Sequence, residues 1–144
     1  MPGPPRGMPI GRRLASTAKE VSRAFGEALA AVGGSEHVWL ILLALKTREN
    51  ANQRALAAAV GIQGATLTHH LNAMEDAGLV TRRRDPRNRR IHVVELTPEG
   101  EAAFLRMRSA AVEFDERLRG DLSDDDLERV AAVLDQLRAN VAPD

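Results

Sequence analysis

The chain of 144 residues contains no cysteine and no tyrosine, and aromatic side chains make up only 3% of it. The absence of cysteine excludes disulfide bonds, thiolate metal sites and cysteine-based sensing of peroxide, and it agrees with a reducing cytoplasm. The scarcity of aromatic side chains, in a chain rich in Ala and Leu, argues against a β-sandwich and favours helices packed through aliphatic side chains.

Long apolar segments are also missing. The longest run, Val38 to Leu45, is far shorter than the roughly 20 residues that cross a bilayer. The start of the chain through Pro9 is rich in Pro and Gly and lacks the hydrophobic core of an export signal. We therefore expect a cytoplasmic protein with no membrane partner.

Signatures of catalysis are absent as well. The sequence has no glycine loop that would cradle phosphate, no nucleophile motif and no histidine pair with metal-ligand spacing. These absences predict that the protein is not an enzyme and that it holds neither a metal nor a cofactor.

What the chain does have is a concentrated positive charge. Its net charge is zero, yet six of its twenty Lys and Arg residues fall within residues 82–94. The rest of the chain therefore leans acidic. This segregation matters more than the net charge, because a nucleic-acid phosphate backbone contacts only one face of a protein.

Apolar periodicity and capping residues predict four helices in the first half of the chain. The first occupies residues 10–34 and ends at paired glycines, and Ser35 caps the second. Asn52 caps a short third helix, and residues 64–77 form the fourth. The close succession of the last two predicts a helix-turn-helix.

A β-hairpin and two further helices are predicted to follow. Residues 79–84 and 91–96 are β-prone and flank a polar turn, which indicates a hairpin. Thr97 and the proline after it mark the start of a fifth helix, and Ser123 with Asp126 opens a sixth. The predicted fold is thus mostly α with a small β-hairpin.

The order of elements and several motifs resemble the MarR (multiple antibiotic resistance regulator) family. The segments that carry the resemblance are Trp39 with Leu42 to Leu45, Leu56-Ala57, Val60-Gly61-Ile62, Ala65 to Thr68, Met74 to Val80, Asp85 to Arg90, and Leu96 to Gly100. The resemblance implies a winged helix-turn-helix with N- and C-terminal dimerisation helices, in which the hairpin is the wing. It also implies a pocket for an effector, often a phenolic or other aromatic anion, to which Arg23, His37 and Trp39 are candidate contributors, although Trp39 also suits the core.

Asn88 departs from the family pattern, in which the wing usually has an aspartate that pairs with the arginine two residues later. Asn88 makes no ion pair, but it is able to accept a hydrogen bond from Arg90. Because exposed ion pairs contribute only about 0–1 kcal/mol, we expect a looser wing that keeps its function.

The organisation expected from these patterns has four parts: a disordered start (1–9), an N-terminal dimerisation helix (10–34), a winged helix-turn-helix (35–97) and C-terminal dimerisation helices (98–144). Apolar stripes predict the dimer contacts, for which the candidates are Leu14, Val21, Phe114, Leu118, Leu127, Val130, Leu134 and Leu137. The alternative is that these stripes cover the core of their own subunit.

With one face of the fourth helix buried, the 100° step per residue turns the candidate DNA-reading side chains outward. They are Ala65, Thr66, Thr68, His69 and Asn72. His70 leans toward the buried side and suits packing. The alternative for any single reader is a contact with phosphate or solvent only.

In the hairpin, Arg89 and Arg90 are expected at the tip, in the minor groove, because guanidinium suits a narrow groove. Arg82, Arg84 and Arg87 are expected on phosphates, with Arg82 and Arg84 on one face of the strand. The alternative is that the arginines form a solvated surface only.

The sequence predicts a sequence-specific, homodimeric transcriptional regulator, a ligand-responsive repressor that binds a pseudo-palindromic operator in double-stranded DNA. The rival hypothesis is a winged-helix protein-interaction module without specific DNA binding, in which the arginines meet acidic protein surfaces.

Overall fold

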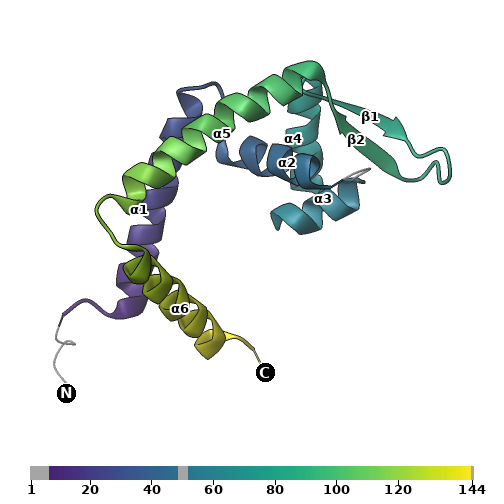
Figure 1. Cartoon of the computed structure of the whole chain (residues 1–144). Coiled ribbons are helices and arrows are strands. Elements are labelled where there is room, and N and C mark those ends of the chain that lie inside the picture. Colours follow the sequence, from purple (N-terminus) through teal and green to yellow (C-terminus); the bar gives the residue numbers. More distant parts are fainter. Residues whose placement is uncertain (1–6, 49–51, 144) are drawn as a thin grey trace. The chain divides into compact units, whose positions relative to one another are not determined.

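A computed structural model describes residues 7–48 and 52–143 (Figure 1). The described elements, in chain order, are α1 (Ile10–Ala30), α2 (Glu36–Thr47), α3 (Gln53–Val60), α4 (Gly64–Asp76), β1 (Val80–Arg84), β2 (His92–Leu96), α5 (Pro98–Arg119) and α6 (Asp124–Val141). The mostly helical fold with one hairpin is confirmed. Residues 1–6 of the expected disordered start lie outside the described part. No described helix is long and apolar enough to span a membrane.

The chain divides into two compact units. The first ends at Ala111 and the second begins at Val112, so the division falls within α5. The predicted boundary between residues 97 and 98 stays a prediction.

Local capping fixes the helix boundaries of the first unit where the sequence predicts them. The Ser35 hydroxyl accepts a hydrogen bond from the backbone N–H of Val38, 3.3 Å away, at the start of α2. The Asn52 carboxamide oxygen accepts from the N–H of Ala55 at 2.8 Å and so caps α3. Each cap satisfies an N–H group that has no partner inside the helix.

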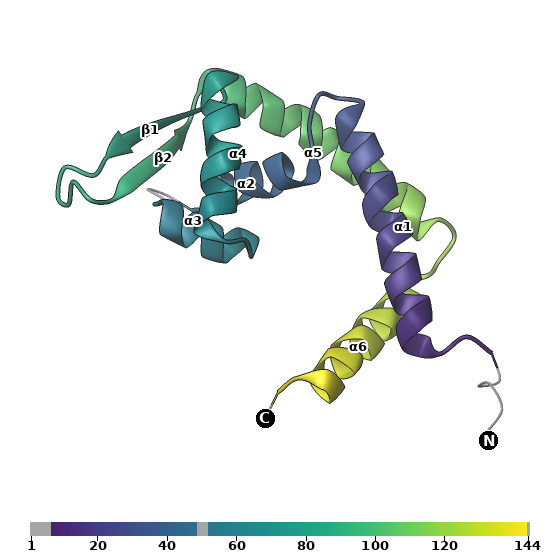
Figure 2. The same cartoon turned by 180° about the vertical axis from the view of Figure 1, so that it is seen from behind.

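The helix-turn-helix depends on a sharp turn at Gly61. This residue has a φ of 77°, in the left-handed region that glycine adopts without a steric penalty. α4 begins three residues later, and it buries Leu67, Leu71 and Met74. In the two opposite views of the molecule, α4 lies beside α3 and over α2 (Figures 1 and 2). The predicted helix-turn-helix is confirmed.

The two strands pair in an antiparallel hairpin that follows α4. The register places Val80 opposite Leu96 and Arg84 opposite His92. A single β-bridge joins Val93 to Asn52, so the second strand is also tied to the start of α3. Val80 and Val94 are buried, and they attach the base of the hairpin to the core.

α5 starts against the chain segment that leads into β1. The Thr97 N–H donates to the Leu79 carbonyl at 3.1 Å, and the Thr97 hydroxyl accepts from the Gly100 N–H at 3.0 Å. A Cβ atom at Gly100 would lie only 2.0 Å from the Leu79 oxygen. The first turn of α5 therefore lies so close to the backbone of Leu79 that only glycine fits at position 100.

The core of the first unit is mainly aliphatic, as the scarcity of aromatic residues predicts, with Phe104 as its buried aromatic side chain. It draws on α1 to α5 and both strands, and its largest fully buried side chains are Leu29, Ile41, Leu42, Leu56, Leu67, Leu71, Met74, Met107 and Val80. This core holds α4 and the base of the hairpin as parts of one unit.

The second unit consists of the end of α5 and α6. The chain turns at Gly120, whose φ is 52°. Ser123 and Asp126 then form a reciprocal capping box at the start of α6, as the sequence predicts. Within this unit, α6 has no buried residue.

Candidate nucleic-acid interface

The side chains predicted to read DNA lie on the outer face of α4. Ala65, Thr66, Thr68, His69 and Asn72 are all exposed. Because α4 buries its opposite face, these side chains are presented together on a helix that the core holds in place. Their predicted role in DNA binding stays a prediction.

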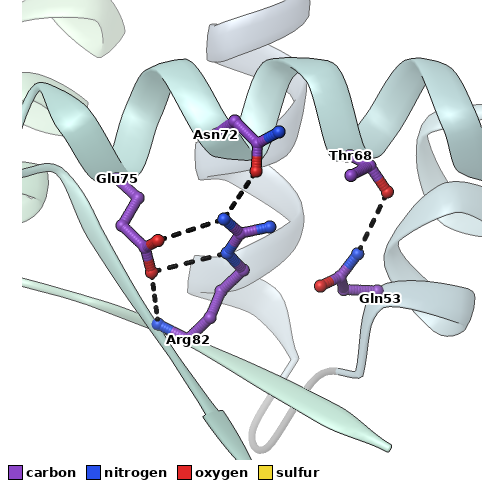
Figure 3. A network of polar contacts seen from close by, with 5 residues as sticks. All are labelled: Gln53, Thr68, Asn72, Glu75 and Arg82. Carbon is purple, nitrogen blue, oxygen red and sulfur yellow. Dashed lines mark hydrogen bonds and ion pairs between the residues drawn. The ribbon is translucent and has the colours of Figure 1, made fainter.

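The hydroxyl of Thr68 is engaged within the chain. It donates to the carbonyl of Gly64 at 2.9 Å, one helical turn earlier. It also lies 3.4 Å from the Gln53 Nε2 atom, which donates to it and links α3 to α4 (Figure 3). The methyl group is thus the part of Thr68 that is free of intramolecular hydrogen bonds.

Arg82, at the base of the hairpin, is bound to α4 (Figure 3). Its Nη2 atom donates to Glu75 Oε1 at 3.0 Å and to Asn72 Oδ1 at 2.6 Å. Its Nε atom and its backbone N–H donate to Glu75 Oε2, at 3.4 and 3.1 Å. The guanidinium hydrogen bond holds the pKa of the Glu75 carboxyl below its ordinary value. The predicted phosphate contact of Arg82 would therefore have to compete with an internal ion pair.

Arg83 pairs on the other face of the strand. Its Nη2 and Nε atoms donate to Glu95 Oε1, at 2.7 and 3.1 Å, and this hydrogen bonding raises the pKa of Arg83. The separate partners of Arg82 and Arg83 agree with the alternation expected along a strand.

The turn of the hairpin is organised by two polar side chains. Asp85 Oδ1 accepts from the backbone N–H of Arg87 at 2.8 Å, and Asn88 Oδ1 accepts from the N–H of Arg90 at 3.2 Å. The expected bond between Asn88 and Arg90 thus exists, but it uses the backbone of Arg90. Asn88 shapes the turn and does not orient the guanidinium.

Four arginines of the hairpin keep their charge available. Among the described residues, no ion pair or side-chain hydrogen bond engages the guanidinium groups of Arg84, Arg87, Arg89 and Arg90. All four residues are exposed. The hairpin therefore presents positive charges that no ion pair within the described residues neutralises. Such charges are available to bind a polyanion.

Reasoning from the sequence missed two members of this site, Glu75 and Gln53. Glu75 lies three residues after Asn72, a spacing that places both on one side of a helix and was the available signal. Nothing in the sequence near Gln53 indicates its contact with Thr68. A hollow of about 520 Å³ is lined by Gln53, Thr68, Glu75, Arg82 and His92.

The residues proposed for an effector pocket have separate partners. Arg23 Nη1 pairs with Glu27 at 2.7 Å, and the Trp39 ring stacks on Phe104 with 5.6 Å between the centroids. The His37 ring stacks on His70 at 4.7 Å. A second hollow of about 600 Å³ lies between α2, β2 and α5, and it includes none of the three candidates. Their role in effector binding stays a prediction.

Three histidines gather where α2 meets α4. The ring of His70 lies between those of His37 and His69, with centroids 4.7 and 5.7 Å away. Partial burial, and then the charges of these two neighbours, lower the pKa of His70. His70 thus packs, as the sequence predicts. In the described part of the chain, no group of three His, Cys, Asp or Glu side chains is placed to hold a metal ion.

The predicted dimer contacts have exposed members in each unit. In the first unit, Leu14 on α1 is 38% exposed. In the second unit, Leu118 on α5 and Val130 and Leu134 on α6 are 50%, 50% and 41% exposed. The half-buried members of the set are Val21, Phe114, Leu127 and Leu137. The function of these apolar side chains stays a prediction.

Comparison with known proteins finds relatives that share this architecture. Residues 35–92, from the cap of α2 into β2, match the model of the MarR family. The uncharacterised HTH-type transcriptional regulator YdgJ of Bacillus subtilis (strain 168) is 29% identical over 78% of this chain and 68% of its own. The transcriptional repressor CouR bound to a 23-mer DNA duplex is 28% identical, with a TM-score of 0.82 over 90% of this chain and 92% of its own.

A further structure of a similar protein contains a small molecule. CouR from Rhodococcus jostii RHA1 bound to p-coumaroyl-CoA is 25% identical, with a TM-score of 0.75 over 94% of this chain and 93% of its own. The family match covers the helix-turn-helix and most of the hairpin, and the structural matches cover nearly the whole chain. Residues 35–92 are therefore similar to the MarR family, and most of the chain is similar to helix-turn-helix transcriptional regulators.

Proposed function

We propose that this protein is a transcriptional regulator of the MarR family, a homodimeric, ligand-responsive repressor that binds a pseudo-palindromic operator through α4 and the hairpin. The observation that carries the proposal is the joint placement of two features in one unit. α4 presents an exposed polar face, and the hairpin bound to it presents four uncompensated arginines. The first feature suits base edges in the major groove, and the second suits phosphates and the minor groove.

Each part of the interface has a distinct task. The N-terminal end of α4, with Ala65, Thr66 and His69, enters the major groove, where Ala65 meets a thymine methyl and the polar groups meet base edges. Arg89 and Arg90 at the tip of the hairpin enter the minor groove, and Arg84 and Arg87 bind phosphates.

A dimer places two such surfaces on one duplex. The exposed apolar side chains of α1 and α6 support a contact with a second copy, because such surface is costly to leave in water. Two-fold symmetry then matches half-sites about one DNA turn apart.

The relatives support repression and an effector. CouR is a repressor that binds a DNA duplex, and CouR binds p-coumaroyl-CoA. For this chain we propose a small aromatic or phenolic effector and no resident cofactor. The effector would release DNA by favouring a dimer with the wrong spacing between its reading surfaces, which requires a difference in its affinity for the two states.

The direct experiment is footprinting of the DNA upstream of the protein's own gene. The expected result is protection of two half-sites about one turn apart, lost when both Arg89→Ala and Arg90→Ala are introduced. The double variant Arg106→Ala and Arg108→Ala removes the same charge from exposed positions on α5, and it should keep the footprint. An absence of any footprint would favour the protein-interaction module.

A further inference from the structure

The orientation of the Asn72 amide is fixed by chemistry. Its side chain lies 2.6 Å from the Nη2 atom of Arg82, and a guanidinium offers only N–H donors. The atom that faces it must be the carboxamide oxygen, because the amide nitrogen is also a donor. The amide nitrogen therefore stays free of this contact, on an exposed residue of α4.

Arg82 itself is held in place. Three donors of this one residue, the backbone N–H, Nε and Nη2, reach the carboxylate of Glu75 at 3.0 to 3.4 Å. The side chain of Arg82 is only 18% exposed, against 40% for Glu75. A guanidinium fixed by both its backbone and its fork is pre-organised, so it holds Asn72 in one orientation before any DNA binds.

An engaged oxygen changes what an asparagine recognises. A free carboxamide pairs with adenine by accepting from N6–H and donating to N7. The Asn72 oxygen has a second lone pair, but an adenine amino group that used it would place its positive hydrogens beside the Arg82 cation. The free amide N–H groups instead suit two neighbouring acceptors, which are O6 and N7 of guanine.

We propose that Arg82 is a positioning residue for Asn72. By occupying the carboxamide oxygen, it leaves Asn72 only its amide N–H donors to contact acceptor atoms of a base. The chain therefore selects guanine and rejects adenine at the base pair that Asn72 contacts. This inference rests on the proposed DNA binding, and it adds the specificity of one position to it. It also assigns Glu75, an acidic residue on a DNA-reading helix, the task of holding Arg82.

The first test selects binding sites from random duplexes with the wild-type chain and with Asn72→Ala. The position where the variant loses its preference identifies the base pair that Asn72 reads, and the wild-type chain should select G·C there. Selection of A·T at that position overturns the inference, as does a variant whose preferences are unchanged everywhere. A wild-type chain that selects no sequence overturns the proposed function itself, a result distinct from either.

The second test releases the oxygen of Asn72. Arg82→Met keeps the length of the half-buried stem and removes every side-chain donor, so the ratio of A·T to G·C binding at that position should rise about tenfold or more. The matched control is Arg84→Met, on the same face of β1, which should weaken binding to all sequences equally. The inference is wrong if Arg82→Met behaves like Arg84→Met.

A milder variant covers the case in which Arg82→Met does not fold, which circular dichroism would reveal. Glu75→Gln weakens the hold on Arg82 and leaves the guanidinium in the chain. It should shift the base preference in the same direction by a smaller factor. An unchanged preference in folded Glu75→Gln, together with misfolded Arg82→Met, also counts against the inference.

Discussion

The free hydrogen-bonding groups of single side chains decide what α4 offers to DNA. The Thr68 hydroxyl is occupied by Gly64 and Gln53, whereas no side-chain hydrogen bond is described for Thr66, in the same exposed turn. Two threonines at neighbouring positions therefore present different chemistry. Thr68 offers its methyl group, and Thr66 offers its hydroxyl as well.

Thr68→Val should consequently bind a selected operator within about threefold of the wild-type affinity, because valine keeps the methyl group. Thr66→Val should weaken binding by roughly five- to tenfold, on the order of one lost hydrogen bond. Fluorescence anisotropy with a labelled duplex measures both affinities. A larger loss for Thr68→Val than for Thr66→Val would show that the assignment is reversed.

His70 should make stability depend on pH. Its pKa is lowered in the folded protein, so the unfolded chain binds more protons between the folded pKa and the ordinary value near 6.5. The free energy of unfolding should therefore be highest above pH 6.5, and it should fall as the pH drops through this window. Urea unfolding at pH 7.5 and 5.5 measures this loss, and His70→Gln should reduce it.

His92 provides the control for the histidine prediction, since it is exposed on β2 and stands outside the cluster. His92→Gln removes one histidine and leaves the cluster intact, so comparison with it isolates the contribution of His70. Equal effects of His70→Gln and His92→Gln would mean that the cluster is not its source.

At the scale of elements, the first turn of α5 lies very close to the backbone that leads into β1. A Cβ atom at Gly100 would lie 2.0 Å from the Leu79 carbonyl oxygen, which is backbone and not a flexible side chain. Gly100→Ala should therefore lower the free energy of unfolding by about 1–3 kcal/mol, the usual cost of overpacking. Denaturant unfolding measures it.

Gly26 is the matched control, because it lies inside α1 and an added Cβ would meet no atom within 4 Å. Gly26→Ala should stabilise the protein by roughly 0.5–1 kcal/mol, since alanine favours a helix over glycine. The close contact would be contradicted if Gly100→Ala lowered the free energy of unfolding by no more than the amount by which Gly26→Ala changes it.

Elements whose signals are local could be predicted from the sequence. The caps at Ser35, Asn52 and Ser123 and the turn at Gly61 depend on residues within one helical turn, so spacing alone locates them. The outward face of α4 followed from periodicity for the same reason. The hydrogen bonds of Thr68 and Asn72 depend on Gln53 and Arg82, which folding brings close from other elements, and spacing along one helix does not show them.

At the scale of the whole molecule, contact with a second copy would bury the exposed apolar side chains of α6. Leu134 belongs to the predicted stripe and is 41% exposed. Leu134→Glu should therefore shift the protein from dimer to monomer, because it places a charge in an apolar contact. Sedimentation velocity at micromolar protein measures the change in mass.

Ala132→Glu adds the same charge at an exposed position of α6 outside the stripe, and it should leave the dimer intact. A wild-type chain that sediments as a monomer would contradict the proposed dimer. Dissociation by both variants would show that the stripe is not the contact.

The central claim is that α4 and the arginine hairpin form one DNA-binding surface that a dimer presents twice. Its most direct test is the salt dependence of binding to a selected palindromic duplex. Four free hairpin arginines per subunit predict that log affinity falls with log salt at a slope of about −7. Arg89→Ala with Arg90→Ala should reduce the slope to roughly −4. A wild-type slope near zero, or one that the double variant leaves unchanged, would contradict the claim.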